Sequence, residues 1–184
     1  MRNIFIDCGY NIGDVTDDTY KQKGEEYDYF AFEANPYLFK AYKDRHPFCK
    51  LEEKAVWIED CTLPFYVVKV DKYGEDNAFT GASTLNAEKS KWNMSVHKKE
   101  EKVEVKAFNF SSFILNNFKK NDNIVIKMDI EGAEYKVLNK MIEDGSIDYV
   151  NQLTVEFHDE KTGESSKEIM REINRKGINF SNWH

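Results

Sequence analysis

Short apolar runs alternate with polar or amphipathic segments along the chain. The run from Ile4 to Ile6 is continuously apolar, which is typical of a strand buried on both faces of a parallel sheet. The alternation of such runs with helical periods predicts an α/β fold, with helices on the faces of a central sheet. We expect strands at residues 4–7, 28–33, 51–57, 62–70, 103–110, 123–130, 149–157 and, at one edge, 178–183, and helices at residues 14–23, 35–45, 111–118, 131–142 and 165–176.

Residues 71–100 interrupt this alternation, and the pattern does not predict their structure. The segment contains Gly74, Gly81, Ser83 and Thr84. Long connections of this kind are usually functional or mobile, so we predict a partly ordered lid or substrate loop.

The loop after the first strand holds the strongest functional signal. Asp7, Gly9, Asn11 and Gly13 occupy alternate positions where the apolar run gives way to a polar helix. Glycine permits a tight turn and close approach to a ligand, and the helix N-terminus beyond presents unpaired N–H groups. Glu33 closes the next apolar run 20 positions after Gly13. In nucleotide-binding α/β folds a carboxylate at about that distance binds a ribose, so the pattern predicts a cofactor site.

Charged side chains gather where the predicted strands end, at Asp7, Glu33, Asp129, Glu156 and His158. Ligands of open α/β sheets bind beyond the carboxyl ends of the strands. Because side chains alternate along a strand, Lys127 shares one side with Asp129, and Glu156 shares one side with His158. The pattern therefore predicts a cleft surrounded by an ammonium group, carboxylates and an imidazole.

Several of these residues also have a purely structural interpretation. Asp7 could cap a turn, and Glu131 and Glu134 could complement the dipole of the helix that they begin. His158 could be an exposed residue at a strand end. Tyr10, inside the glycine loop, is either a packing residue or an aromatic face for a cationic ligand.

Composition narrows the class of protein. The 184 residues suit a single domain, and 33 acidic against 26 basic residues give a net charge of −7, which argues against a nucleic-acid partner. Basic residues from Lys89 to Lys106 are mixed with acidic ones, as in a solvated polar connection, and a rim of the active site is the alternative. The odd number of cysteines (Cys8, Cys49 and Cys61) without metal-ligand spacing suggests reduced intracellular thiols. No apolar secretion signal or membrane span is expected, so we expect a cytoplasmic protein.

Five segments in order resemble the FkbM family of S-adenosylmethionine-dependent methyltransferases: IFIDCGYNIG, FEANP, GASTL, IKMDIEGAEYKVL and TVEFH. The resemblance extends from about residue 3 to residue 160. It implies a Rossmann-like class I methyltransferase fold, with a central, mostly parallel sheet of about seven strands and helices on both faces. It also implies S-adenosylmethionine as the cofactor and methyl transfer to a hydroxyl group, often that of a sugar or glycan.

The resemblance also implies roles for individual residues. The cofactor site would comprise Asp7, Gly9, Tyr10, Asn11, Gly13, Glu33, Ala34, Asn35, Ala55, Val56 and Asp129. Within it, the glycine loop would hold the methionine end, Glu33 the ribose, and Ala55 with Val56 the adenine. Tyr10 departs from the family, which usually has a small residue at this position.

The expected reaction requires in-line alignment of donor and acceptor and removal of a hydroxyl proton. We expect His158 or Asp129 to take this proton, with Lys127 orienting the carboxylates. Glu131, Glu134 and His158 would face the acceptor. A divalent cation on Asp129 and Glu156 is an alternative way to lower the hydroxyl pKa.

Two other classes of protein share parts of this pattern. A nicotinamide-dependent oxidoreductase would use a similar strand, loop and acidic residue, but its Gly-x-Gly-x-x-Gly fingerprint is not present here. A non-catalytic nucleotide-binding domain would keep the loop and need none of Asp129, Glu156 and His158.

Overall fold

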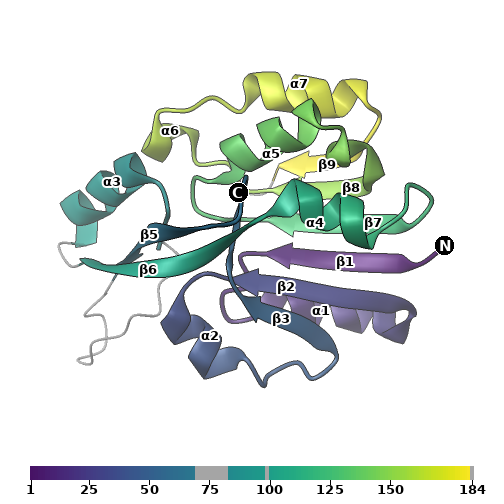
Figure 1. Cartoon of the computed structure of the whole chain (residues 1–184), viewed down its shortest axis with the longest axis horizontal. Helices are drawn as coiled ribbons and strands as arrows, with labels where there is room; N and C mark the ends of the chain where they lie inside the picture. The colour runs from purple at the N-terminus through teal and green to yellow at the C-terminus, as the bar shows by residue number, and fades with distance from the viewer. Residues whose placement is uncertain (69–82, 98–99, 183–184) are drawn as a thin grey trace.

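The computed structural model describes residues 1–68, 83–97 and 100–182, in which strands and helices alternate (Figure 1). Six strands form one all-parallel sheet in the order β3-β2-β1-β7-β8-β9. Their bounds are β1 Asn3–Cys8, β2 Tyr27–Glu33, β3 Cys49–Glu53, β7 Asn123–Met128, β8 Val150–Val155 and β9 Asn179–Asn182. The chain moves outward from β1 to β3 and then returns to the other side of β1 as β7. The strand order therefore reverses between β1 and β7, where open α/β sheets bind their ligands.

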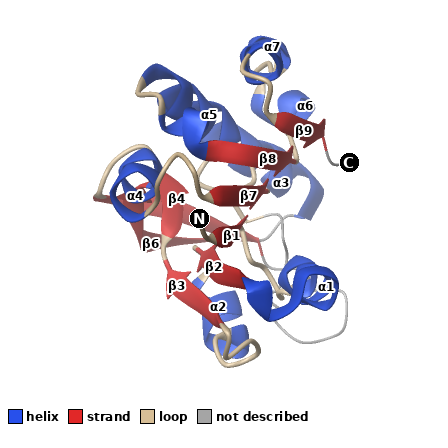
Figure 2. Ribbon diagram, turned by 90° about the vertical axis from the view of Figure 1, so that its right-hand side faces the viewer, coloured by secondary structure: helices blue, strands red, loops and turns tan. Residues whose placement is uncertain are grey.

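Helices cover both faces of this sheet, which confirms the predicted α/β fold (Figure 2). The helices α4 (Phe110–Asn117), α5 (Glu134–Glu143) and α7 (Lys167–Arg175) contribute to the main apolar core, and α1 (Asp14–Lys23) packs on the opposite face. Across the described ranges, no helix combines the length and apolar character that a bilayer crossing requires.

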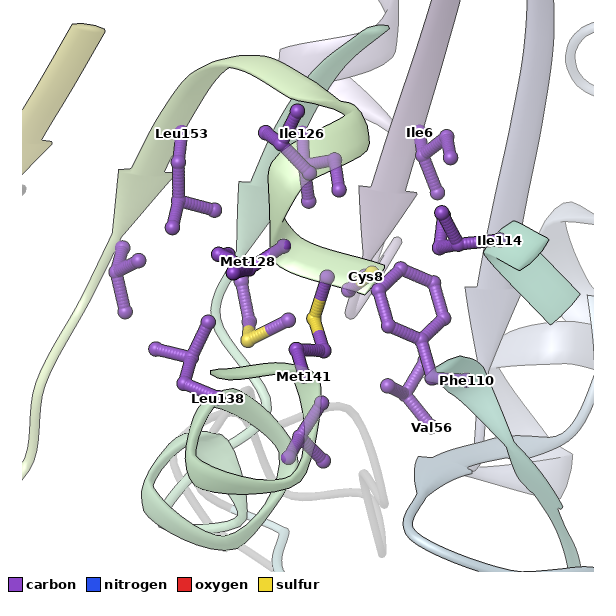
Figure 3. Packing of buried hydrophobic residues seen from close by; sticks show 14 of the residues in the cluster. Ile6, Cys8, Val56, Phe110, Ile114, Ile126, Met128, Leu138, Met141 and Leu153 are labelled. Carbon is purple, nitrogen blue, oxygen red and sulfur yellow. The ribbon is translucent and has the colours of Figure 1, made fainter. Parts of the chain in front are cut away.

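The alternation of side chains along β1 explains how one strand serves two cores. Ile4 and Ile6 belong to the main cluster, whereas Phe5 belongs to the smaller cluster beneath α1. Figure 3 shows Ile6 with Phe110 of α4 and Met141 of α5 in the main cluster. Burial of these apolar side chains on both faces fixes the strand ends that form the site.

A second sheet has three strands in the order β4-β6-β5, with bounds β4 Ala55–Trp57, β5 Cys61–Val68 and β6 Glu100–Asn109. Here two details of the sequence prediction are wrong. The strand expected at residues 51–57 is interrupted at Lys54, and its halves β3 and β4 join different sheets. Because β4, β5 and β6 pair with one another, the described residues form sheets of six and three strands instead of one sheet of about seven.

The helix predicted at residues 131–142 begins three residues later, at Glu134. Glu131 and Gly132 have φ values of +59° and +103°, which a right-handed helix does not allow. The helix α2 (Pro36–Tyr42) starts as predicted, because the Asn35 side chain accepts the N–H groups of Tyr37 and Leu38. It ends before Arg45. A short helix that the pattern does not predict, α6 (Asp159–Thr162), follows β8.

The predicted lid at residues 71–100 lies only partly within the described residues. Residues 71–82 and 98–99 are outside them. The described part places Thr84 in an antiparallel bridge with Tyr66 and forms the helix α3 (Ala87–His97). In Figure 1, α3 lies on the side of the molecule toward which β1 and β2 point.

Candidate functional site

The loop between β1 and α1 has a left-handed backbone at three positions. The φ values are +85° at Gly9, +53° at Asn11 and +88° at Gly13. A Cβ atom added to Gly9 would lie 1.9 Å from the carbonyl oxygen of Asp129, so no side chain fits there. Because the backbone at Gly9 approaches the residue that follows β7, the glycine loop and Asp129 form one edge of the site.

The carboxylate of Glu33, at the end of β2, is held by backbone donors. Its Oε2 accepts the N–H of Asn11 and its Oε1 accepts the N–H of Asn35, both at 2.7 Å. Each oxygen of a carboxylate has two lone pairs, so each retains one for a ligand. Burial raises the pKa of Glu33 to about 7, although these two hydrogen bonds act in the opposite direction. Glu33 is therefore a fixed acceptor that titrates near neutral pH.

An open cleft with about 540 Å³ of empty space, adjoining solvent included, lies next to Glu33 and the glycine loop. Its polar lining residues are Gly9, Asn11, Glu33, Asn35, Lys54, Ser83, Asp129 and Glu131. Its apolar lining residues are Phe32, Ala34, Leu38, Ala55, Val56, Phe65, Leu85 and Ile130. The cleft can therefore accommodate a ligand that has both an apolar ring and a polar or charged end.

A buried ion pair supports the glycine loop. Oδ1 of Asp7 lies 3.2 Å from Nζ of Lys127, and Oδ2 of Asp7 accepts the hydroxyl of Thr16 at 2.8 Å. Lys127 also donates to the carbonyl oxygen of Gly9 at 2.6 Å. Burial alone would lower the pKa of Lys127, but the carboxylates of Asp7 and Asp129 outweigh it and raise that pKa. Lys127 is thus a charged residue that holds the loop from outside the cleft lining.

Carboxylates surround the imidazole of His158, whose side chain is 2% exposed. Its Nε2 lies 3.2 Å from Oε2 of Glu131 and 3.6 Å from Oε1 of Glu156. Its Nδ1 lies 3.4 Å from Oε1 of Glu134. Burial raises the pKa of the nearby Asp129 carboxyl. One ligand atom each from Asp129, Glu134 and His158 lie within 4.8 Å of one another, a spacing that could hold a metal ion.

Lys89 joins this cluster, although the sequence favoured a solvated connection there and gave a rim of the active site as the alternative. It lies on α3 with a side chain that is 1% exposed, and its Nζ contacts the carboxylate of Glu131. Burial lowers the pKa of Lys89 to about 7. Two residues near Lys89 in the sequence hold the turn that contains Glu131. The hydroxyl of Thr84 donates to the carbonyl oxygen of Glu131, and the side-chain amide of Asn86 donates to the carbonyl oxygen of Gly132. No sequence period reveals this role, because it depends on where α3 packs.

Tyr10 faces away from the residues that line the cleft. Its hydroxyl lies 2.7 Å from Nδ1 of His46, and Nε2 of His46 lies 2.9 Å from Oδ1 of Asp17. Its ring also fills the space beside Gly13, where an added Cβ would lie 2.5 Å from the phenol. Tyr10 therefore packs against the loop, and it is not among the cleft residues.

The structure brings together most of the residues that the sequence singled out. Nine of them line the cleft: Gly9, Asn11, Glu33, Ala34, Asn35, Ala55, Val56, Asp129 and Glu131. Asp7, Gly13, Lys127 and His158 support the lining from behind or beside it. Seven lining residues were missed: Phe32, Leu38, Lys54, Phe65, Ser83, Leu85 and Ile130. Four of them lie in segments that carry the family resemblance: Phe32 in FEANP, Ser83 and Leu85 in GASTL, and Ile130 in IKMDIEGAEYKVL.

Comparison with known protein families identifies the family of this chain. The family model described as Methyltransferase FkbM domain matches residues 7–180. This chain belongs to the FkbM methyltransferase family. A search of curated proteins gives no match, and neither does a search of solved structures. Membership makes the chain a methyltransferase and implies S-adenosylmethionine as its methyl donor.

The cleft of this FkbM methyltransferase fits that donor. Gly9 leaves the space that a Cβ would fill, and Glu33 has a free lone pair on each carboxylate oxygen for ribose hydroxyls. The apolar lining residues, such as Val56, can bury a purine ring. The carboxylates of Asp129 and Glu131 offer negative charge for a cationic sulfur.

Proposed function

We propose that this FkbM methyltransferase transfers the methyl group of S-adenosylmethionine to a hydroxyl group of a sugar or glycan acceptor. The observation that supports it best is the pair of cleft carboxylates, Asp129 and Glu131, with His158 3.2 Å behind the latter. A hydroxyl is a weak acid and must lose its proton as the new bond forms. It is therefore the acceptor that gains most from such a cluster.

The proposed cofactor contacts follow from the geometry of the cleft. Gly9 and Asn11 would contact the methionine end, and Glu33 would accept hydrogen bonds from the ribose hydroxyls. Ala55 and Val56 would pack against the adenine. Asp7, Gly13 and Lys127 would act on the cofactor only through the loop that they hold, and Tyr10 through its packing on that loop.

S-adenosylmethionine supplies a methyl group already activated by a positively charged sulfur. The residues of the chain must then hold donor and acceptor in line, which can contribute about 7–11 kcal/mol to lowering the barrier. Asp129 or Glu131, which both line the cleft, would accept the hydroxyl proton, a contribution of about 10²–10⁴-fold in rate. His158 would stabilise the carboxylate of Glu131 from behind, and Lys89 would hold Glu131 in place.

A second cavity, of about 860 Å³, supports a place for the acceptor. It shares Leu85 with the cofactor cleft and includes Gly132, which follows the cleft carboxylate Glu131. Trp57 lines it, with Nζ of Lys136 5.2 Å from the ring centroid. We assign the acceptor to this cavity. Leu85, in the described part of the segment at residues 71–100, would then border both ligands, as expected for a substrate loop.

Two experiments test the proposal. Calorimetric titration with S-adenosylmethionine, and separately with NAD, should show one site for the first ligand and none for the second. Incubation with methyl-labelled S-adenosylmethionine and panels of sugars, glycans, amines and thiols, followed by mass spectrometry, should then place the label on a hydroxyl oxygen. Binding of NAD alone, or label found only on nitrogen or sulfur, would overturn the proposal.

A further inference from the structure

The side chain of His158 has one ring nitrogen without a hydrogen-bond partner. The imidazole is 98% buried, and among the described residues no donor or acceptor forms a hydrogen bond with Nδ1. Oδ1 of Asp129 is likewise buried without a hydrogen-bond partner in the described structure. Oε2 of Glu131 and Nζ of Lys89 contact each other, but Nδ1 of His158 and Oδ1 of Asp129 remain. Buried polar atoms are nearly always paired, so these two atoms indicate a missing ligand.

The carboxylates around the other ring nitrogen favour the form of His158 that carries its proton there. Nε2 faces two carboxylates, Oε2 of Glu131 at 3.2 Å and Oε1 of Glu156 at 3.6 Å. A proton on Nε2 satisfies this side and leaves Nδ1 with a lone pair. Nδ1 then faces Oε1 of Glu134 at 3.4 Å. Two lone pairs repel each other at that separation unless a cation lies between them.

The carboxylate of Glu134 is fixed in place for such a cation. Its oxygens accept the N–H of Ile130 at 2.9 Å and the N–H of Gly132 at 2.8 Å. These bonds orient the carboxylate and leave one lone pair on each oxygen. Ligand atoms each about 2.1 Å from one ion and 3.4 Å apart subtend an angle of about 110°, close to the tetrahedral value.

We propose that Asp129, Glu134 and His158 form a binding site for a divalent first-row transition-metal ion, with His158 bound through Nδ1. One ligand atom of each residue lies within 4.8 Å of the others. One imidazole nitrogen with two carboxylate oxygens suits Mn²⁺, Fe²⁺ or Zn²⁺ better than Ca²⁺, which prefers oxygen ligands alone. Lys127 approaches Oδ2 of Asp129, at 3.9 Å, and so leaves Oδ1 for the ion.

The ligand set differs from the pair that the sequence suggested. Glu156 faces Nε2 of His158, and with Glu131 it forms the outer carboxylates of a carboxylate–histidine–metal arrangement. Any part that the ion plays in methyl transfer rests on the proposed function. Bound to an ion, Asp129 and His158 would be ligands, so Glu131 would be the cleft carboxylate left to accept the proton.

Metal binding can be measured without methyl donor or acceptor. Mn²⁺ alone is titrated by calorimetry into the full chain after treatment with a chelator and desalting. We expect one ion per chain. His158→Ala and Asp129→Asn should each weaken binding at least tenfold. Glu160→Gln, which changes an exposed carboxylate two residues after His158 on α6, should leave it unchanged.

A second readout keeps the test decisive if a variant folds poorly. Pulsed electron paramagnetic resonance of Mn²⁺ on the wild-type chain should show coupling to one imidazole nitrogen. The proposal is overturned if Mn²⁺ does not bind, if both variants bind it as the wild type does, or if no nitrogen coupling is found. If His158 carries a proton on both ring nitrogens, Nδ1 has no lone pair for the ion and Mn²⁺ will not bind. Because no methyl donor is present, this experiment and the methylation assay can fail independently.

Discussion

The backbone N–H of Asn11 donates to Oε2 of Glu33 at 2.7 Å, and this bond joins the glycine loop to the end of β2. Asn11 reaches this position with a φ of +53°, a left-handed conformation that asparagine tolerates better than most residues. The hydrogen bond places the residue proposed for the methionine end of the cofactor beside the residue proposed for its ribose. The protonation state of one carboxylate therefore affects both ends of the cofactor site.

We expect the affinity for S-adenosylmethionine to rise with pH between 6 and 8. Burial raises the pKa of Glu33 to about 7 in the free protein, so at pH 6 most molecules hold a neutral carboxyl group there. The ionised form is the better acceptor for ribose hydroxyls, and affinity falls with the fraction of competent protein. The dissociation constant should decrease about tenfold over this range, as measured by calorimetry in buffers of different ionisation enthalpy.

Glu33→Gln provides the control for this pH dependence. The amide cannot ionise, so its affinity should be lower than that of the wild type at pH 8, by about 1–3 kcal/mol, and nearly independent of pH. A variant that retained the full pH dependence would assign the titration to another group and remove Glu33 from the site.

Replacement of Gly9 tests the close approach between the loop and β7. Gly9→Ala would place a Cβ 1.9 Å from the carbonyl oxygen of Asp129, and its φ of +85° is already unfavourable for alanine. The control is Gly163→Ala, where φ is +73° but no atom lies within 4 Å of the added Cβ. The control should lose about 1–2 kcal/mol of unfolding free energy, and Gly9→Ala clearly more.

Both variants are measured by denaturant unfolding monitored by circular dichroism. Gly9→Ala should also weaken binding of S-adenosylmethionine, because the loop must move away from Asp129 to make room for the side chain of the new alanine. Equal losses of stability in the two variants would show that the loop relaxes without cost.

Local chemistry explains which parts of the fold the sequence predicts. The cap at Asn35 and the continuous apolar run of β1 depend on neighbours in the chain, so both are readable. The division of residues 51–57 at Lys54 depends on pairing with β6, which is distant in sequence. Strand period alone does not show that one apolar run will be shared between two sheets.

Tyr10→Phe tests whether the departure from the family affects the cofactor. The hydroxyl lies 2.7 Å from Nδ1 of His46 and is part of a chain of contacts that continues to Asp17. Loss of this hydrogen bond should cost about 1 kcal/mol of unfolding free energy. Affinity for S-adenosylmethionine should stay within about twofold of the wild type, a difference of about 0.4 kcal/mol. A tenfold loss of affinity with unchanged stability would place Tyr10 in contact with the cofactor.

The candidate site also combines features that neighbours in the sequence determine with features that distant packing determines. Strand-end carboxylates such as Asp129 can be predicted, because parallel strands end at one edge of a sheet. Lys89 could not be predicted in this role. It lies among other charged residues in the sequence, and only the packing of α3 against the turn at Glu131 buries it.

The pair formed by Lys89 and Glu131 should be coupled far more strongly than an exposed pair on the same helix. Lys89 is 1% exposed, whereas Lys91 is 70% exposed and lies 2.6 Å from Glu88. Removal of one partner from a buried pair leaves the other charge without compensation, and removal of both relieves it. We therefore expect Lys89→Met to destabilise the protein and Glu131→Gln, added to it, to restore at least about 1 kcal/mol.

Unfolding is followed at pH 6, because burial lowers the pKa of Lys89 to about 7 and the ammonium form is needed. The matching cycle with Lys91→Met and Glu88→Gln should give a coupling close to zero. Equal coupling in the two cycles would mean that Lys89 does not hold Glu131 in the site.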